Sequence, residues 1–268
     1  MRYVYDHDFH IHSSLSLCSK DEQQSAERIL QYARDLGLKK ICVTDHFWDD
    51  EIPGASNWYG KQNYEWLTRI LPLPQYEGIQ FHFGAETETY KDNTIAIGKK
   101  SFDKFDFVVI PTTHLHNAGF CLTNEEAASV EGRAAAWQRK LDALLHSDIP
   151  FYKTGIAHLA CNLIAPTRSE VLAVLDSLPE AELKRCFTRA ADVGVGIELN
   201  SYDMGFEESE AATILRIFEI AKACGCKFYM GSDAHHPARF GETKAVFERA
   251  IDYLELKESD KFELVKVK

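Results

Sequence analysis

The chain has 268 residues, of which 45% are hydrophobic and 26% are charged, and its formal net charge is −11. This composition is ordinary for a globular protein, and the acidic charge argues against a nucleic-acid polymer as partner, because such polymers are bound by stripes of Lys and Arg. No apolar run approaches the roughly 18 residues that a membrane span needs. Residues 1–6 do not resemble a signal peptide, so we expect a cytoplasmic protein with no membrane segment.

Seven cysteines, an odd number, are scattered without paired CxxC spacing. In a chain of this length without an export signal, such a pattern is typical of reduced thiols. The number of subunits is not set by any sequence feature.

Short apolar segments alternate with helical patterns along the chain. The first strand is expected near Tyr3–Phe9, and Ser25–Leu36 follows as a helix with its C-terminal stop at Gly37. Six further strands are expected at Lys40–Val43, Ile79–Phe83, Asp106–Ile110, Lys153–Ala157, Val195–Leu199 and Lys227–Met230. The remaining helical stretches are Trp58–Leu73, Asn124 to about His146, Ser169–Ser177, Glu180–Val193, Glu208–Ala223 and Gly241–Tyr253, before a mixed, charged tail at Glu255–Lys268. This alternation predicts an α/β protein with a parallel sheet, doubly wound or closed into a barrel, in one domain that spans residues 1–268.

Side chains that can bind metals follow nearly every predicted strand. His10 and His12 are two residues apart in an extended segment, so they point to the same face and reach one place. Barrel enzymes carry their chemistry at the carboxyl ends of their strands, and the recurrence there favours a barrel with a metal site over scattered structural histidines. The later strands end near Asp45 and His46, Glu86 and Glu88, His114 and His116, His158, Glu198 and Asn200, and Asp233 and His235.

The order of these motifs resembles that of the PHP (polymerase and histidinol phosphatase) family. The family pattern is an opening His-x-His, a Thr-Asp-His, a Gly-x-Glu, two isolated strand-end histidines and a late Asp-x-His. These motifs occur here in the same order at residues 10–12, 44–46, 84–86, 114, 158 and 233–235. The resemblance implies a distorted (β/α)7 TIM-like barrel whose rim holds two or three divalent metal ions.

The resemblance also implies a ligand set. The first metal would have four ligands: His10, His12, Glu86 and Asp233. Glu86 would bridge to a second metal held by two rings, those of His114 and His158. The third would be held by His46, His235 and Cys18, which stands where many relatives have His or Asp. Alternatively, Asp21 replaces Cys18, or the third site is weak.

Imidazole and carboxylate ligands favour Zn²⁺, Mn²⁺ or Fe²⁺ over Mg²⁺. A shared carboxylate such as Glu86 holds two ions about 3.5–4 Å apart, and a hydroxide between them attacks a phosphate ester whose oxygens the same ions neutralise. We therefore predict a metal-dependent phosphoesterase that hydrolyses a small phosphate monoester, with L-histidinol phosphate suggested by family analogy. The expected catalytic residues are Glu86, Asp233 and His235.

Neighbouring side chains are expected to assist. Those expected to orient the ligands are Asp8, Asp45 and Glu88, although Asp45 is equally suited to cap a strand end. Those expected to contact substrate are Arg168, Arg239 and His116. The loop Trp48–Gly60 is interpreted as either a lid or a hydrophobic flap. Two other functions fit the same residues: a nuclease or nucleotide phosphodiesterase, and a non-catalytic binding module.

Overall fold

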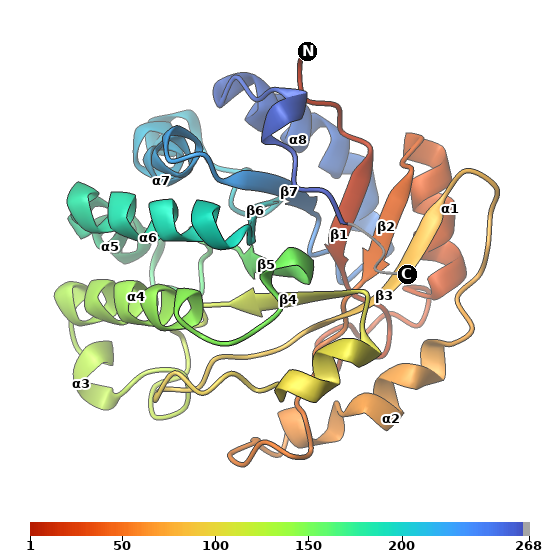
Figure 1. Cartoon of the computed structure of the whole chain (residues 1–268), viewed down its shortest axis with the longest axis horizontal. Helices are drawn as coiled ribbons and strands as arrows, with labels where there is room; N and C mark the ends of the chain where they lie inside the picture. Colours follow the sequence, from red (N-terminus) through yellow and green to blue (C-terminus); the bar gives the residue numbers. More distant parts are fainter. Residues whose placement is uncertain (265–268) are drawn as a thin grey trace.

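Seven parallel strands follow one another around a nearly closed barrel, with helices on its outside (Figure 1). The computed structural model describes residues 1–264. The strands are β1 (His7–Ile11), β2 (Lys40–Val43), β3 (Gln80–Glu86), β4 (Phe107–Pro111), β5 (Thr154–Ala157), β6 (Gly196–Asn200) and β7 (Lys227–Gly231). The segment after β7 meets β1, because the Asp233 amide donates to the His10 carbonyl at 2.7 Å. The predicted (β/α)7 TIM-like barrel is confirmed.

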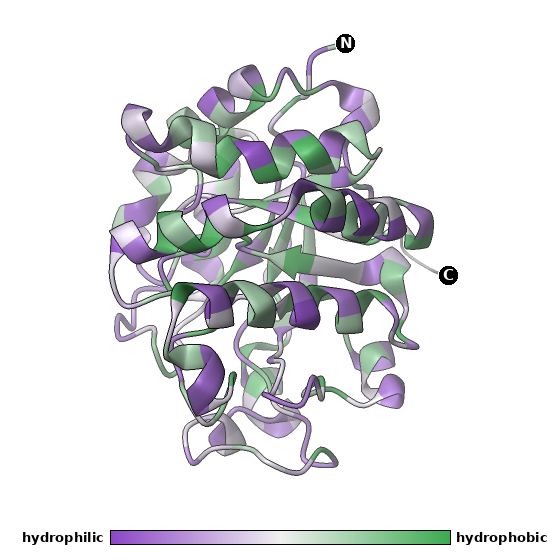
Figure 2. Ribbon diagram, turned by 90° about the vertical axis from the view of Figure 1, so that its left-hand side faces the viewer, coloured by the Kyte–Doolittle hydropathy of each residue, from purple (hydrophilic) through white to green (hydrophobic). Residues whose placement is uncertain are grey.

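The helices lie where amphipathic patterns predict them, and hydrophilic and hydrophobic residues alternate along those that face the viewer in Figure 2. They are α1 (Ala26–Leu36), α2 (Tyr64–Leu67), α3 (Asn124–Ala127), α4 (Val130–Leu145), α5 (Arg168–Ser177), α6 (Glu180–Val193), α7 (Ala211–Ala223) and α8 (Phe240–Tyr253). The stretch predicted at Trp58–Leu73 contains only α2 and two short 3₁₀ turns. The last four residues of the predicted tail lie outside the described residues.

The single long helix expected after Asn124 is wrong, because two helices occupy that stretch. The Ser129 side chain accepts a hydrogen bond from the Gly132 amide at 3.0 Å and so caps a new helix, α4. A Cβ at Gly132 would lie 2.5 Å from the Glu126 carbonyl oxygen, so the close approach of α3 and α4 requires glycine there.

A β-bulge in β1 turns His10 into the barrel. β1 has one more residue than β2 between Asp8 and Ile11. Asp8 points outward and accepts a hydrogen bond from the Tyr32 hydroxyl of α1 at 3.0 Å, whereas Phe9 packs inside the barrel. The bulge then shifts the alternation by one residue, so that His10 faces the interior as well.

The C-terminal segment covers the amino ends of the strands. Phe262 and Leu264 join a buried interior cluster with Phe107 and Tyr229. The Phe262 amide also donates to the carbonyl of Phe228 in β7 at 2.8 Å. The barrel is therefore filled from this end by aromatic side chains, and only the opposite end, where the strands finish, is free to form a site.

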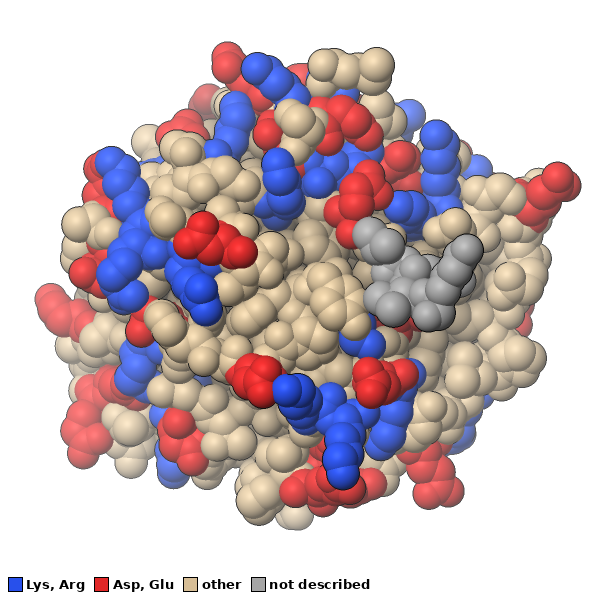
Figure 3. Space-filling view, in the orientation of Figure 1, with Lys and Arg blue, Asp and Glu red and all other residues tan. Residues whose placement is uncertain are grey.

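The surface agrees with the composition. On the face shown in Figure 3, Lys and Arg are interspersed with Asp and Glu, and the described residues of that face form no continuous basic stripe. No helix within residues 1–264 has both the length and the apolar character required to cross a bilayer.

Candidate metal centre

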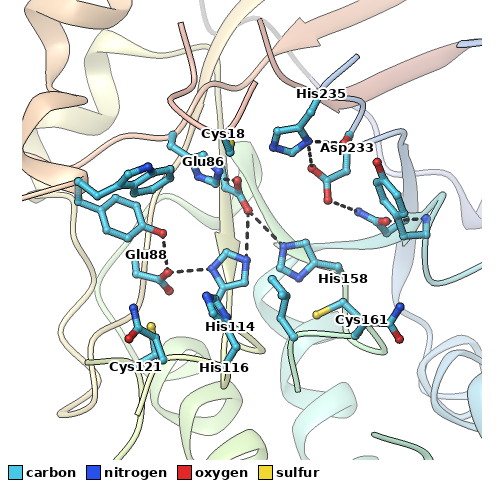
Figure 4. Close-up of a pocket in the computed structure, with 18 of the residues that line it drawn as sticks. Cys18, Glu86, Glu88, His114, His116, Cys121, His158, Cys161, Asp233 and His235 are labelled. Atoms are coloured by element: carbon cyan, nitrogen blue, oxygen red, sulfur yellow. Dashed lines mark hydrogen bonds and ion pairs between the residues drawn. The ribbon is translucent and has the colours of Figure 1, made fainter. Parts of the chain in front are cut away.

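The predicted metal ligands gather around a cavity of about 520 Å³ at the carboxyl ends of the strands (Figure 4). Its lining includes His46, Glu86, His114, His158, Asp233 and His235. His10 and His12 are fully buried against Glu86 and Asp233. The structure therefore brings side chains from β1, β2, β3, β4, β5 and β7 to one place.

The carboxylate of Glu86 lies between two groups of rings. Its Oε2 atom is 2.9 Å from His46 Nδ1 and 3.3 Å from His12 Nε2. Its Oε1 atom is 3.2 Å from His158 Nε2 and 4.0 Å from His114 Nε2. One carboxylate thus faces nitrogens from four strand ends, the geometry of a bridging ligand.

Hydrogen bonds assign the tautomers of the two β1 histidines. His10 Nδ1 donates to Glu198 Oε1 at 2.7 Å. The Ser16 hydroxyl donates its own proton to Asp45, so it can only accept from His12 Nδ1, which lies 2.8 Å away. When both rings are neutral, both Nε2 atoms present lone pairs only 3.1 Å apart. Two converging lone pairs repel unless a proton or a metal cation lies between them, so these residues fit a metal ion.

Hydrogen bonds also assign the tautomers of His114 and His158, which follow β4 and β5. His114 Nδ1 donates to Glu88 Oε2 at 2.8 Å. His158 Nδ1 donates at 3.0 Å to Thr113 Oγ1, which itself donates to the His158 carbonyl. The two rings stack at 4.7 Å and direct their Nε2 atoms toward Glu86. Their donor atoms form a second group of metal-binding geometry with Glu86.

A third group consists of His12, His46 and His235, whose donor atoms lie within 4.8 Å of one another. His46 Nδ1 is buried and lies 2.9 Å from Glu86 Oε2, a contact that does not meet hydrogen-bond geometry. A buried nitrogen without a well-formed hydrogen bond is costly unless it binds an ion, so this group also fits a cation. Cys18 lines the same cavity, but its thiol is not part of that group among the described residues.

We expect the replacement of Cys18 by Ser to lower turnover by less than about tenfold, because the group retains three imidazoles. The measurement is phosphate release at saturating Zn²⁺ and Mn²⁺, with zinc content determined in parallel. A loss as large as that of a Glu86 variant would contradict this and make the thiol an indispensable ligand.

The electrostatics of the cluster favour added positive charge. Burial alone would raise the pKa of Glu86, but His46 and His10 outweigh it and hold that pKa well below its usual value. Burial would lower the pKa of His12, but hydrogen bonds to Asp233 and Glu86 raise it to about 9. The carboxylates are therefore ionised, and divalent cations can replace the protons that the rings attract.

Two predicted ligands have left-handed backbone conformations, at φ 32° for His158 and φ 52° for Asp233. Non-glycine residues rarely adopt this region, and such strain is typical of functional sites. The backbone around His158 is held on both sides: its own amide donates to Glu198 at 2.7 Å, and the Ala160 amide donates to Asp203 at 2.9 Å.

Asp203 is buried, and burial raises its pKa to about 7 despite the opposing charge of His158. The folded state therefore binds this proton more tightly than the unfolded state, and stability falls as pH rises from about 4 to about 7. In metal-free protein, we expect Asp203→Asn to raise the free energy of unfolding at pH 8 by about 2 kcal/mol, and by less at pH 5. Urea unfolding at both pH values measures this, and an equal gain at both would contradict it.

Two of the three acids that were predicted to orient ligands make no direct contact with an imidazole. Asp45 accepts from the hydroxyls of Ser13 and Ser16, and only Ser16 touches an imidazole. Asp8 accepts from the His10 amide at 3.3 Å and contacts no ring of the cluster. Of the three acids, only Glu88 contacts the imidazole of a predicted ligand directly, that of His114.

The residues predicted to contact substrate lie at different distances from the cavity. His116 lines it and is exposed. Arg168 lines a neighbouring depression and is paired with Glu210 at 2.6 Å. Arg239 pairs with Glu242 at 2.8 Å. Their contact with substrate stays a prediction.

The loop after β2 forms part of the site. The Tyr59 hydroxyl donates to Glu88 Oε2 at 2.7 Å, and the Trp58 ring lies edge-on to His46 at 5.1 Å. Sequence reasoning missed Tyr59, Ser16, Thr113 and Asp203 as supports. Only Ser16 lies near its partner in the sequence, four residues after His12. The other three residues contact groups that are distant from them in the sequence.

No protein-family model matches the chain. A probable phosphatase from Caldicellulosiruptor bescii is 23% identical over 239 residues, which cover 89% of this chain and 84% of that protein. A probable phosphatase from Aliivibrio fischeri is 26% identical over 225 residues, which cover 83% and 75%.

The fold has a match among solved structures. A histidinol phosphate phosphatase from Lactococcus lactis, crystallised with zinc, L-histidinol and phosphate, has a TM-score of 0.50 to this chain at 15% identity. The match covers 91% of this chain and 93% of that one. Fold and sequence relatives together define a barrel enzyme of the phosphatase class. More particularly, the solved structure has the barrel fold that the resemblance of the motifs to the PHP family implies.

Proposed function

We propose that this protein is a cytoplasmic phosphomonoesterase that hydrolyses a small phosphorylated metabolite with two or three divalent cations. The observation that carries the proposal is the position of Glu86, whose two oxygens face separate groups of imidazoles. When bound, the cations supply an activated water and neutralise the oxygens of the ester. Zn²⁺, Mn²⁺ and Fe²⁺ suit the mixed nitrogen and oxygen donors best.

The chain's own residues prepare the site for that reaction. Glu86 and Asp233 keep their carboxylates ionised, because the neighbouring imidazoles hold the pKa of each well below its usual value. Burial, reinforced by the charge of His12, lowers the pKa of His235 to about 4, so its ring is neutral near pH 7. Because its Nδ1 donates to the Asp233 carbonyl at 2.8 Å, its Nε2 lone pair is left to bind a cation or accept a proton.

The proposal is tested by metal analysis and substrate screening. Protein purified without chelator is expected to retain at least two equivalents of divalent metal and to release phosphate from a panel of phosphorylated metabolites, with L-histidinol phosphate tested first. Protein that neither retains metal nor releases phosphate would be a non-catalytic module. Preference for oligonucleotides over every monoester would instead indicate the nuclease alternative.

A further inference from the structure

The cavity extends beyond the metal ligands. Its volume, about 520 Å³, is within the range of pockets that enclose a whole small organic molecule rather than a phosphate group alone. Among the described residues, no Lys or Arg lines it. The part of the wall that is free to contact an organic group is mainly aromatic, aliphatic or amide, with one hydroxyl and one exposed imidazole, those of Ser56 and His116, beside Trp58, Asn117, Asn162, Leu163 and Tyr202.

Two of these side chains are unusually exposed. Leu163, in the loop after β5, is 38% exposed, and Tyr202, in the loop after β6, is 44% exposed. They come from neighbouring strands and both line the cavity. Hydrophobic side chains left open beside a catalytic cavity are suited to contact the apolar part of a ligand.

Charged groups near this wall already have partners. Glu88 accepts hydrogen bonds from His114, from the Tyr59 hydroxyl and from the Thr89 amide, so its carboxylate is not free for a substrate ammonium group. Arg239 covers one face of Tyr202, with its Cζ atom 4.4 Å from the ring centroid. That face of the ring is therefore closed to a cationic group of the substrate.

The cavity also disfavours an additional anionic group on the substrate. A carboxylate or second phosphate would meet no lining Lys or Arg, and Arg239 beside Tyr202 is already paired with Glu242 at 2.8 Å, while Glu88 contributes negative charge to the same cavity. The metal cluster can neutralise only the phosphoryl group that it binds. Charge, size and exposed apolar surface therefore agree on a neutral organic group.

We propose that the organic part of the substrate is uncharged and aromatic, and that its ring packs against Tyr202 and Leu163 while its phosphoryl group faces Glu86. The inference rests on the proposed phosphatase function and specifies the substrate class as aromatic phosphate monoesters. Aromatic contacts of this kind contribute about 0.5–1.5 kcal/mol beyond the burial of apolar area.

The test compares esters whose leaving groups are alkoxides of similar basicity. With metal-loaded protein, benzyl phosphate is expected to have a kcat/KM at least about tenfold above that of glycerol phosphate, equivalent to one aromatic contact plus its buried area. The same preference is expected over 4-carboxybenzyl phosphate and over the cationic L-histidinol phosphate. Equal or reversed values would overturn the inference but leave the phosphatase function standing.

Binding provides a readout that does not depend on turnover. Calorimetry is expected to show tighter binding of benzylphosphonate than of methylphosphonate to the metal-loaded protein, and equal affinities would overturn the inference.

Tyr202→Ala should lower the ratio of kcat/KM for benzyl phosphate to that for glycerol phosphate at least threefold. The matched control Tyr152→Ala, a half-exposed tyrosine outside the cavity lining, should leave that preference unchanged. If no ester is hydrolysed but benzylphosphonate still binds more tightly, the phosphatase function fails and the aromatic pocket stands.

Discussion

Replacement of Glu86 by Gln is expected to lower phosphate release at least about a thousandfold, equivalent to about 4 kcal/mol of lost transition-state stabilisation. The variant keeps the size of the side chain but removes the negative charge that two groups of imidazoles share. It should also retain at least one equivalent less metal. Phosphate release and elemental analysis of the same preparation measure both effects.

Glu88→Gln is the matched control for this prediction. Glu88 lies two residues further along the chain and contacts His114 Nδ1, the nitrogen directed away from Glu86. The Glu88→Gln replacement should therefore lower phosphate release by only about 10- to 100-fold, as for other residues that orient a ligand. Circular dichroism should show both variants folded. Unchanged turnover in Glu86→Gln would refute the bridging role.

Glu198→Ala is expected to have the second-largest effect, on stability and metal affinity together. This fully buried carboxylate accepts from His10 Nδ1 and from the His158 amide, each at 2.7 Å. It also accepts from Asn200 Nδ2, which has a second acceptor in Asp233. The removal of Glu198 therefore leaves the other two buried donors without an acceptor, at about 1–3 kcal/mol each. Metal affinity should fall by about 10- to 100-fold, because His10 is no longer oriented. Urea unfolding and zinc titration measure the two effects.

Two further variants separate this role from general destabilisation. Glu198→Gln keeps an acceptor oxygen and should recover part of the metal affinity, whereas Glu219→Ala, at an exposed position of α7, should change neither quantity. The Glu198 side chain packs closely against Gly231 of β7, because a Cβ on that glycine would overlap the Glu198 carboxylate. Zinc affinity unchanged in Glu198→Ala would show that His10 is oriented by other contacts.

Regular periodicity explains why much of the fold and the ligand set could be predicted. The alternation of short apolar segments with helical patterns is a local property, and it located all seven strands within a few residues. The two-residue spacing of His10 and His12 correctly predicted convergence, since their Nε2 atoms are 3.1 Å apart.

Features that depend on contacts between distant segments could not be predicted. An ideal strand places Asp8 on the same face as His10, but the bulge turns Asp8 outward to Tyr32. Nothing near Asp203 in the sequence indicates that it holds the Ala160 amide. The pairing of Arg168 with Glu210 likewise depends on how α5 lies beside the segment before α7.

The aromatic floor of the barrel has a consequence for folding. Phe262 and Leu264 follow all seven strands in the chain, yet they fill the space beside Phe107 and Tyr229. Until this segment packs, the barrel exposes its interior rings to water, so its final packing must follow the assembly of the strands.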